Sequence, residues 1–214
     1  MDNPPLSLAF CAILCYDGAK QAEKGAFLLQ DNETLRLLRQ RRSIRRFRPD
    51  PIGEDALRTV LEAALYAPYA SPDSRHITAI QNRALLDRLD SAAKAAAARC
   101  GEPHLQALGR DPAYHCFYRA PVLTLLSGSR RAVQPEADCA AAAENLLLAA
   151  AALGLGSCWL FFPTMAFFGP EADALRQALR IPEDFQPYAA VALGMPAETP
   201  DAPARDPACI TVIR

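Results

Sequence analysis

The sequence predicts a single domain in which helices and strands alternate around a central mixed sheet, which places it in the α+β or α/β class. Two observations support this prediction. The chain has 214 residues, of which 51% are hydrophobic, enough for one sizeable core and too few for two comfortable domains. Segments with helical periodicity also alternate with short apolar runs bounded by turn residues, and we find no internal repeat.

Residues 1–30 form an extension without a strong period whose role the sequence does not indicate, so the domain is expected over residues 31–214. The N-terminus lacks the basic segment of a signal peptide, and no apolar run reaches the roughly 18 residues of a membrane span. The seven cysteines are odd in number and show no metal-binding spacing, as expected for unpaired thiols in a reducing cytosol. We therefore expect a cytoplasmic protein without a membrane segment.

Two helices are predicted before residue 66. The first begins at Asp31 or Asn32, which are residue types that cap helix N-termini, and continues to Arg41. Prolines in the segment 48–51 end it, because proline lacks an N–H and restrains the residue before it. The second helix follows Gly53, because apolar residues there recur at the spacing of one helical face. These apolar residues are Leu57, Val60, Leu61, Ala64 and Leu65.

The middle of the chain continues with alternating elements. Residues 67–74 are rich in turn-forming residues and predict a loop. A strand is expected over 76–80 and an alanine-rich helix over 84–99. Residues 101–119 are mixed and polar, without a clear pattern, and the apolar run 120–128 predicts a buried strand.

A helix expected over residues 137–153 is apolar nearly all round, interrupted by Asp138, Glu144 and Asn145. A helix without a polar face is buried on all sides. In a domain of this size, that burial suggests that a second subunit covers one side of the helix. Gly154 is expected to end the helix as the residue after its C-cap.

The last third of the chain predicts two more buried strands, a helix and an extended arm. The strands are expected over 156–162 and 188–194, with a helix over 171–180 between them. Residues 196–207 are rich in proline and are expected to be extended. A final strand is expected over 209–214, and a lone strand after such an arm favours pairing with a distant segment or a second subunit.

A cluster of arginines is the most unusual feature of the sequence. Five arginines occur within residues 41–48, although the formal net charge of the chain is −1. That balance argues against a nucleic-acid-binding protein or one held on an acidic membrane surface. A helix C-terminus favours one or two cations, whereas a phosphate site would use several, because guanidinium groups match phosphate oxygens and Ser43 adds a hydroxyl donor. Both interpretations remain open on composition alone.

Other motifs give little support to acid–base, metal or dinucleotide chemistry. The glycines of residues 154–157 follow a helix and precede a strand, the reverse of a dinucleotide-binding motif, so a helix cap and turn is favoured. His76, His104 and His115 have no obvious acid partner in the sequence and are expected to be structural or exposed. We expect no catalytic acid or base and no metal site. Cys158 is expected to be a buried packing residue.

Four segments, taken in order, resemble the FMN-dependent nitroreductase family. They are RRSIRRFRPDPIGEDALRTVLEAALYAP (41–68), FYRAPVLTLL (117–126), ENLLLAAAALGLGSCWL (144–160) and IPEDFQPYAAVALGMPAETPDAPAR (181–205). The resemblance covers roughly residues 33–214. It implies an α+β, three-layer fold with a mixed, mainly antiparallel central sheet flanked by helices. It also implies an intertwined homodimer with the flavin at the subunit interface.

The resemblance gives the arginine cluster a role in binding FMN. Arg41, Arg42 and Ser43 would hold the phosphate and the ribityl chain. Arg45 would reach the pyrimidine edge of the flavin, and Arg205 would return from the C-terminal arm to the phosphate. Arg46 and Arg48 are expected to be surface charges. Further flavin contacts are expected from two other segments: Pro68, Tyr69, Ala70 and Ser74 in the loop, and Leu160, Phe161 and Phe162 at the end of the strand expected over 156–162.

The sequence departs from the family pattern at two places. The loop after Pro68 lacks the family's asparagine, and Ser74 stands at the position of a glutamine that binds the flavin. Asp73 would place a negative charge near a reduced flavin if its side chain pointed inward. Pro203 replaces the second basic residue of the arm. These changes favour a lower affinity for the flavin or a shifted redox potential.

The activity that the resemblance implies is hydride transfer from NADH or NADPH, through flavin N5, to an electron-poor acceptor such as a nitroaromatic or a quinone. The cofactor performs this chemistry, and no side-chain acid or base is needed. Phe161, Phe162 and Tyr69 would form a stacking wall for the acceptor, although ordinary core packing explains the two phenylalanines equally well. Two alternatives are a substrate dehydrogenation on the same fold and a non-catalytic protein that binds a flavin or another anion.

Overall fold

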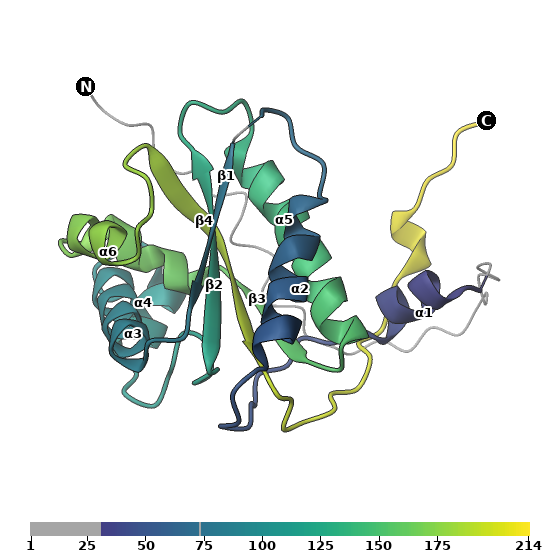
Figure 1. The fold of residues 1–214 in the computed structure, drawn as a ribbon, viewed down its shortest axis with the longest axis horizontal. Coiled ribbons are helices and arrows are strands. Elements are labelled where there is room, and N and C mark those ends of the chain that lie inside the picture. The colour runs from purple at the N-terminus through teal and green to yellow at the C-terminus, as the bar shows by residue number, and fades with distance from the viewer. Residues whose placement is uncertain (1–30, 73) are drawn as a thin grey trace. The chain divides into compact units, whose positions relative to one another are not determined.

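The computed structural model describes residues 31–72 and 74–214, of which residues 32–201 form one compact unit. Within that unit a sheet lies between two layers of helices (Figure 1). The strands are β1 (Arg75–Ile80), β2 (Val122–Ser129), β3 (Gly156–Leu160) and β4 (Phe185–Gly194). The helices are α1 (Glu33–Gln40), α2 (Glu54–Leu65), α3 (Arg83–Ala97), α4 (Pro103–Arg110), α5 (Pro135–Ala152) and α6 (Ala172–Ala178). Two 3₁₀ segments are η2 (Phe162–Phe168) and η3 (Pro207–Cys209).

The sheet has the strand order β1-β2-β4-β3, and all neighbouring strands are antiparallel. A parallel bridge between Ser43 and Ser157 adds a short stretch beside β3. The expected mixed, mainly antiparallel sheet is therefore confirmed. Central strand β4 contains Pro187, which lacks an N–H for the ladder. Pro187 pairs with Ser127 beside a register shift, which is where a sheet tolerates proline.

Two hydrophobic cores lie on the two faces of the sheet. Leu123 and Leu125 of β2 belong to the core that α3, α4, η2 and α6 cover. Val122 and Leu126, which alternate with them, belong to the core under α2 and α5. This period of two explains why β2 reads as a continuous apolar run, since both faces of the strand are buried.

Helix α5 packs one side on the sheet and on α2, and its other side is open in the single chain. Leu146 and Leu147 are buried, whereas Ala137, Ala140 and Glu144 are exposed. The exposed alanines agree with the expectation that a second subunit covers this side, which stays a prediction. Gly154 has φ +70° and ends the helix as expected, with its N–H and that of the next residue bonded to the last-turn carbonyls.

Three predictions from the sequence need correction. Helix α4 lies in the segment 101–119 that showed no clear pattern, and it begins because Glu102 accepts a hydrogen bond from the Leu105 N–H. Strand β3 ends at Leu160 and gives way to the 3₁₀ segment η2. No strand occurs over 209–214 in the described part of the chain, where η3 ends at Cys209. A strand needs a neighbouring strand, and the single chain supplies none there.

The part of the chain that the structure describes contains no helix long and apolar enough to cross a membrane. Within the same ranges, the cysteines are unpaired thiols as expected: Cys100, Cys116, Cys139, Cys158 and Cys209. The expectations for residues 1–30, including two further cysteines, lie outside the described residues.

Candidate functional site

The arginine-rich stretch leaves α1 and is fixed against the edge of the sheet at both ends. The Ile44 N–H donates to the Ser157 carbonyl over 2.8 Å at the start of β3. The Arg48 N–H donates to the Met195 carbonyl over 2.8 Å just after β4. Ile44 is buried and Phe47 packs partly on the core, so these two apolar residues hold the stretch down. The arginines between and around them are left to point away from the core.

The arginines of the cluster have different surroundings. The Arg41 Nε lies 3.6 Å from the Glu144 Oε1 of α5. The Arg42 guanidinium donates to the Arg39 and Arg41 carbonyls over 2.6 and 2.8 Å, so it caps the end of α1. For Arg42, this contact therefore favours the interpretation as a cation at a helix end. It sets Arg42 apart from the other residues of the predicted phosphate site. Arg46 and Arg48 are exposed, as expected for surface charges.

Glu198, which the sequence did not single out, fixes the backbone at the centre of the stretch. Its Oε1 accepts hydrogen bonds from the Arg45 and Arg46 N–H groups over 2.5 and 3.1 Å. The Ala197 N–H in turn donates to the Arg46 carbonyl over 2.9 Å. The residues that follow β4 therefore brace the arginine stretch, and they also bring a carboxylate next to it.

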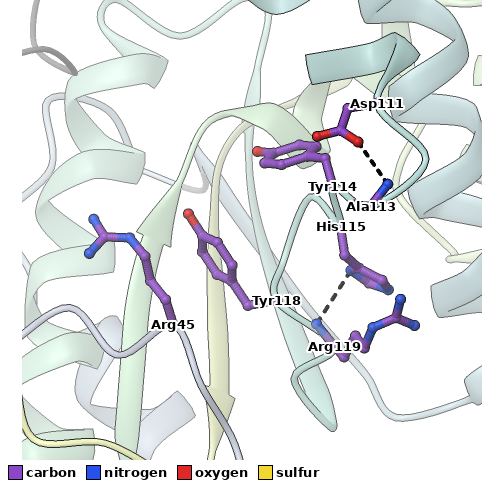
Figure 2. Close-up of a pocket in the computed structure, with 7 residues that line it drawn as sticks. All are labelled: Arg45, Asp111, Ala113, Tyr114, His115, Tyr118 and Arg119. Carbon is purple, nitrogen blue, oxygen red and sulfur yellow. Dashed lines mark hydrogen bonds between the residues drawn. The ribbon is translucent and has the colours of Figure 1, made fainter. Parts of the chain in front are cut away.

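Arg45 lies at the edge of an open cavity of about 420 Å³ (Figure 2). Its guanidinium carbon lies 6.0 Å from the centroid of the Tyr118 ring, within the range of a cation–π contact. Burial lowers the pKa of the guanidinium, but Cys158, Tyr118 and Glu198 together raise it above its usual value, so Arg45 stays charged. The cavity is lined by Arg45, Asp111, Ala113, Tyr114, His115, Tyr118 and Arg119.

Two tyrosines give the cavity hydroxyl groups that remain protonated. Burial is the main reason that the pKa values of Tyr114 and Tyr118 are raised, and the nearby thiols raise both further, although Arg45 opposes the shift of Tyr118. Tyr114 also packs edge-on against Phe162, with ring centroids 5.0 Å apart. Near neutral pH the cavity therefore presents phenol hydroxyls and guanidinium groups, with one carboxylate from Asp111.

A strained turn before β2 presents Tyr118 to the cavity. Tyr118 and Arg119 both have left-handed backbone angles, with φ of 57° and 56°, which are uncommon for residues with side chains. The His115 Nδ1 accepts from the Arg119 N–H over 3.3 Å, and Asp90 of α3 accepts from the Cys116 N–H over 2.8 Å. These hydrogen bonds hold the turn in its strained form.

The fold also brings the Asp90 carboxylate close to His115, which the sequence did not indicate. The His115 Nδ1 lies 3.4 Å from the Asp90 Oδ1, but the two residues are 25 positions apart and only the fold brings them together. Burial is the main reason that the pKa of His115 lies below its usual value, and Asp90 opposes this effect. Because the ring nitrogen accepts from the turn, we assign His115 a structural role, as expected.

The predicted loop contacts lie in a second cluster around Asp138 of α5. Asp138 is only 4% exposed, and its carboxylate accepts from the Ala70 N–H over 2.8 Å and the Ser74 hydroxyl over 2.7 Å. Ser74, which the resemblance placed on the flavin, is 2% exposed and donates to Asp138. The Arg75 guanidinium lies 4.9 Å from the Tyr69 ring centroid. It donates to the Ala64 carbonyl in the last turn of α2 over 3.5 Å and to the Ala67 carbonyl just after the helix over 3.2 Å. The loop is thus firmly held, with Pro68, Tyr69 and Ala70 exposed.

The single chain does not bring this loop and the arginine stretch together. The Ser129 N–H at the end of β2 donates to the Ser74 carbonyl, so the loop lies at that end of the sheet. At the other end, Ser43 of the arginine stretch forms a bridge with Ser157 of β3. Ser157 pairs with Leu193 of β4, and Leu193 pairs with Val122 at the start of β2. Because β2 has eight residues, the two clusters are separated by about 24 Å along the strand direction.

The residues predicted around flavin N5 are mostly packed in the core. Leu160 and Phe162 are buried in the core under α3, and Phe161 is half-buried. For the side chain of Phe162, the structure favours core packing over an exposed stacking wall. Cys158 is 2% exposed, and burial raises the pKa of its thiol, which agrees with the expected packing role. Backbone groups of 160–162 remain the expected contacts with a flavin.

Arg205 belongs to a second unit, residues 202–214, and is exposed there. Its contact with a phosphate held by the arginine stretch stays a prediction. Several residues that the sequence analysis missed line the cavity, above all Tyr114 and Tyr118. The sequence did contain a signal that Asp138 is unusual, because it is one of the few polar residues in an otherwise apolar helix. No group of histidines, cysteines and carboxylates that could hold a metal occurs among residues 31–72 and 74–214.

The three-layer α+β fold thus carries a cavity lined by the two guanidinium groups of Arg45 and Arg119. The profile of the nitroreductase family matches residues 38–195, and the chain belongs to this family of oxidoreductases. A protein of Archaeoglobus fulgidus, named as a candidate NADH dehydrogenase/NAD(P)H nitroreductase, is 31% identical over 79% of this chain and 88% of its own.

Solved structures agree with this membership. A nitroreductase with bound FMN from Bacteroides fragilis has a TM-score of 0.81 and 33% identity, covering 86% of this chain and 100% of its own. A nitroreductase with bound FMN from Desulfitobacterium hafniense has a TM-score of 0.78 and the same coverage. Its identity is 23%, so this second similarity concerns the fold alone.

Proposed function

We propose that the chain is an FMN-dependent oxidoreductase that transfers a hydride from NADH or NADPH to an electron-poor small molecule, such as a nitroaromatic or a quinone. The observation that carries the proposal is the charged Arg45 guanidinium at the cavity of about 420 Å³, on a stretch fixed to the edge of the sheet. Membership of the nitroreductase family and similarity to proteins with bound FMN support the same assignment.

The residues of the arginine stretch fit FMN. The Arg41–Glu144 ion pair is long at 3.6 Å and partly exposed, and such pairs contribute little, so Arg41 can turn to a phosphate. Arg45 supplies a fixed positive charge, and Ser43 lies beside it on the same stretch. Glu198 opposes these charges, but its Oε1 is occupied by two backbone N–H groups. The donor set therefore retains cations and hydroxyls suited to a phosphate and to a flavin ring.

Bound FMN would supply reversible hydride chemistry at N5. Arg41 and Ser43 would hold the phosphate and ribityl chain, with Arg205 as a further cation from the C-terminal segment. Arg45 would lie at the pyrimidine edge, where a cation stabilises the negative charge of the reduced cofactor. Backbone groups of residues 160–162 would orient the ring. We assign Arg42 to capping α1 and Ser74 to holding the loop, because their hydrogen-bonding groups are already engaged.

We further propose that the protein acts as a homodimer. The loop 68–74 and the arginine stretch lie about 24 Å apart in one chain, so they can form one site only if each comes from a different copy. The exposed side of α5, with Ala137 and Ala140, gives an apolar surface through which two copies can pair. Leu65 and Tyr66 at the end of α2 are also exposed apolar or aromatic residues.

An absorption spectrum and an anaerobic titration test the activity. We expect the purified protein to be yellow, to release FMN on denaturation, and to lose its flavin absorbance when NADH or NADPH is added. Arg45→Gln should weaken FMN binding by about 10- to 150-fold, because a hydrogen bond from a charged group contributes about 1.5–3 kcal/mol. Arg48→Gln is the matched control, since Arg48 is exposed and pairs with Asp50 at 3.8 Å.

Other results would redirect the assignment. A yellow protein that neither nucleotide reduces would favour a substrate dehydrogenation or a non-catalytic binding protein. A colourless protein that takes up no added FMN would refute the proposal. For the dimer, Ala140→Arg should yield a monomer by light scattering and lose bound FMN, whereas a monomeric wild-type protein that binds FMN would contradict the shared site.

A further inference from the structure

The contact between Tyr118 and Arg45 has no role in the function proposed above. Arg45 makes no ion pair within 4.0 Å with any side chain in the described ranges. Its polar neighbours are the Cys158 thiol, the Tyr118 hydroxyl and Glu198. Of these, the thiol is uncharged near neutral pH, since its pKa is raised by burial, and the carboxylate binds the backbone. Tyr118 is therefore the main contact that can restrain the guanidinium.

Such restraint matters because an arginine side chain is long and flexible. Fixing it costs rotamer entropy, so an unrestrained guanidinium would not hold one position. The Arg45 guanidinium lies over the Tyr118 ring, 6.0 Å from its centroid, and the charge of Arg45 lowers the pKa of the Tyr118 phenol, against the larger effect of burial. Figure 2 shows the Tyr118 side chain between Arg45 and Tyr114. A single residue thus supplies both a face and a polar group to Arg45.

Tyr118 is itself rigidly presented. Its left-handed backbone, with φ of 57°, is held by the hydrogen bonds of Asp90 and His115 to the same turn. The Tyr118 N–H donates to the His115 carbonyl over 3.1 Å. Backbone strain of this kind persists only where its surroundings fix it. Three separate contacts therefore aim one side chain at Arg45.

We propose that Tyr118 is a positioning residue that fixes the Arg45 guanidinium for the pyrimidine edge of bound FMN, and thereby sets how strongly the protein favours the reduced cofactor. This inference rests on the proposed function. A fixed cation stabilises developing negative charge more than a mobile one, because no reorganisation is required when the charge appears. Tyr118 should therefore affect reduced FMN more than oxidised FMN.

The test is the midpoint potential of FMN bound to the wild-type protein and to Tyr118→Phe, measured against a reference dye. The phenylalanine keeps the ring and the packing of the turn, so the variant is expected to fold. We expect the preference for reduced over oxidised FMN to fall about tenfold, which corresponds to a two-electron potential about 30 mV more negative. The Kd for oxidised FMN should change much less. Tyr188→Phe is the matched control, since Tyr188 is half-buried against the other core.

A double-mutant cycle shows whether Tyr118 acts through Arg45. In the Arg45→Gln background, Tyr118→Phe should cause no further change in potential, because the group it positions is absent. A full shift in that background would overturn the proposal, since Tyr118 would then act on the cofactor directly or through the fold. An unchanged potential in the single Tyr118→Phe variant would overturn it too, while leaving the proposed function intact. A wild-type protein that binds no FMN would refute both.

Discussion

Replacing Asp138 with alanine tests whether one buried carboxylate holds the loop 67–74. The substitution removes the acceptor of two hydrogen bonds, from the Ala70 N–H at 2.8 Å and from the Ser74 hydroxyl at 2.7 Å. Ser74 is buried and would lose its partner, which costs about 1.5–3 kcal/mol for a bond to a charged group. The Ala70 N–H is at an exposed residue and can bind water instead, so it adds about 0.5–1 kcal/mol. We expect the free energy of unfolding to fall by about 2–4 kcal/mol.

Urea unfolding of the cofactor-free protein measures this change. Protein concentration must be the same for all variants, because association would otherwise add to the apparent stability. Hydrogen exchange gives a local readout, since the Ala70 amide should lose protection when its acceptor is removed. Asp173→Ala is the matched control: its side chain is 95% exposed in an ion pair with Arg176, so a change within about 0.5 kcal/mol is expected. A loss below about 0.5 kcal/mol for Asp138→Ala would refute the role of the carboxylate.

Three further predictions concern packing, thiols and pH. Gly194→Ala should cost about 1–3 kcal/mol of unfolding free energy in urea titrations, because the new Cβ would lie 2.7 Å from Pro121 and 2.8 Å from Phe47; Gly101→Ala, with no atom within 4 Å, should be neutral. Mass spectrometry after brief alkylation of the native protein should find Cys209 modified and Cys158 intact, since the first is exposed and burial raises the pKa of the second; modified Cys158 would contradict its burial. Burial lowers the pKa of His76 and His115 below the usual 6.5, so the unfolded chain binds more protons below that pH. The contribution of the two neutral histidines to the free energy of unfolding should therefore be fully present above about pH 6.5 and should decline on acidification. The decline is at most about 1.4 kcal/mol per pH unit for each histidine. His115→Gln should make the unfolding free energy depend less steeply on pH in this range.

The elements that the sequence predicted well are those with local signals. Helix α2 has one apolar stripe, α5 ends at Gly154, and β2 is a short apolar run between turns. Helix α4 was missed because its start depends on the capping of Glu102, while its composition is mixed. The prediction of a strand over 209–214 was wrong, because a strand needs a neighbouring strand and the sequence of one chain does not show where that neighbour lies.

The candidate site was predicted less completely than the fold. The arginine cluster was visible as a run of like charges, but its members looked alike in the sequence. Only the structure separates Arg42, which caps α1, from Arg45, which lies at the cavity. Likewise Asp90 and His115 are 25 positions apart, and Ser74 and Asp138 are 64 apart. Contacts over such separations follow from the packing of α3 and α5 on the sheet, which no local pattern encodes.

The arginine stretch and the loop 67–74 are separated by the length of β2. This separation determines how substitutions in two different chains would combine in one dimer. In the proposed dimer, each site takes its arginine stretch from one chain and its loop from the other. Mixed dimers of an Arg45→Gln chain and an Asp138→Ala chain would then contain one site with both defects and one site with neither. When the two impaired variants are mixed during refolding, each mixed dimer would regain one unaltered site out of two. Genetic lesions at the two ends of the sheet would thus complement each other, whereas lesions at the same end would not.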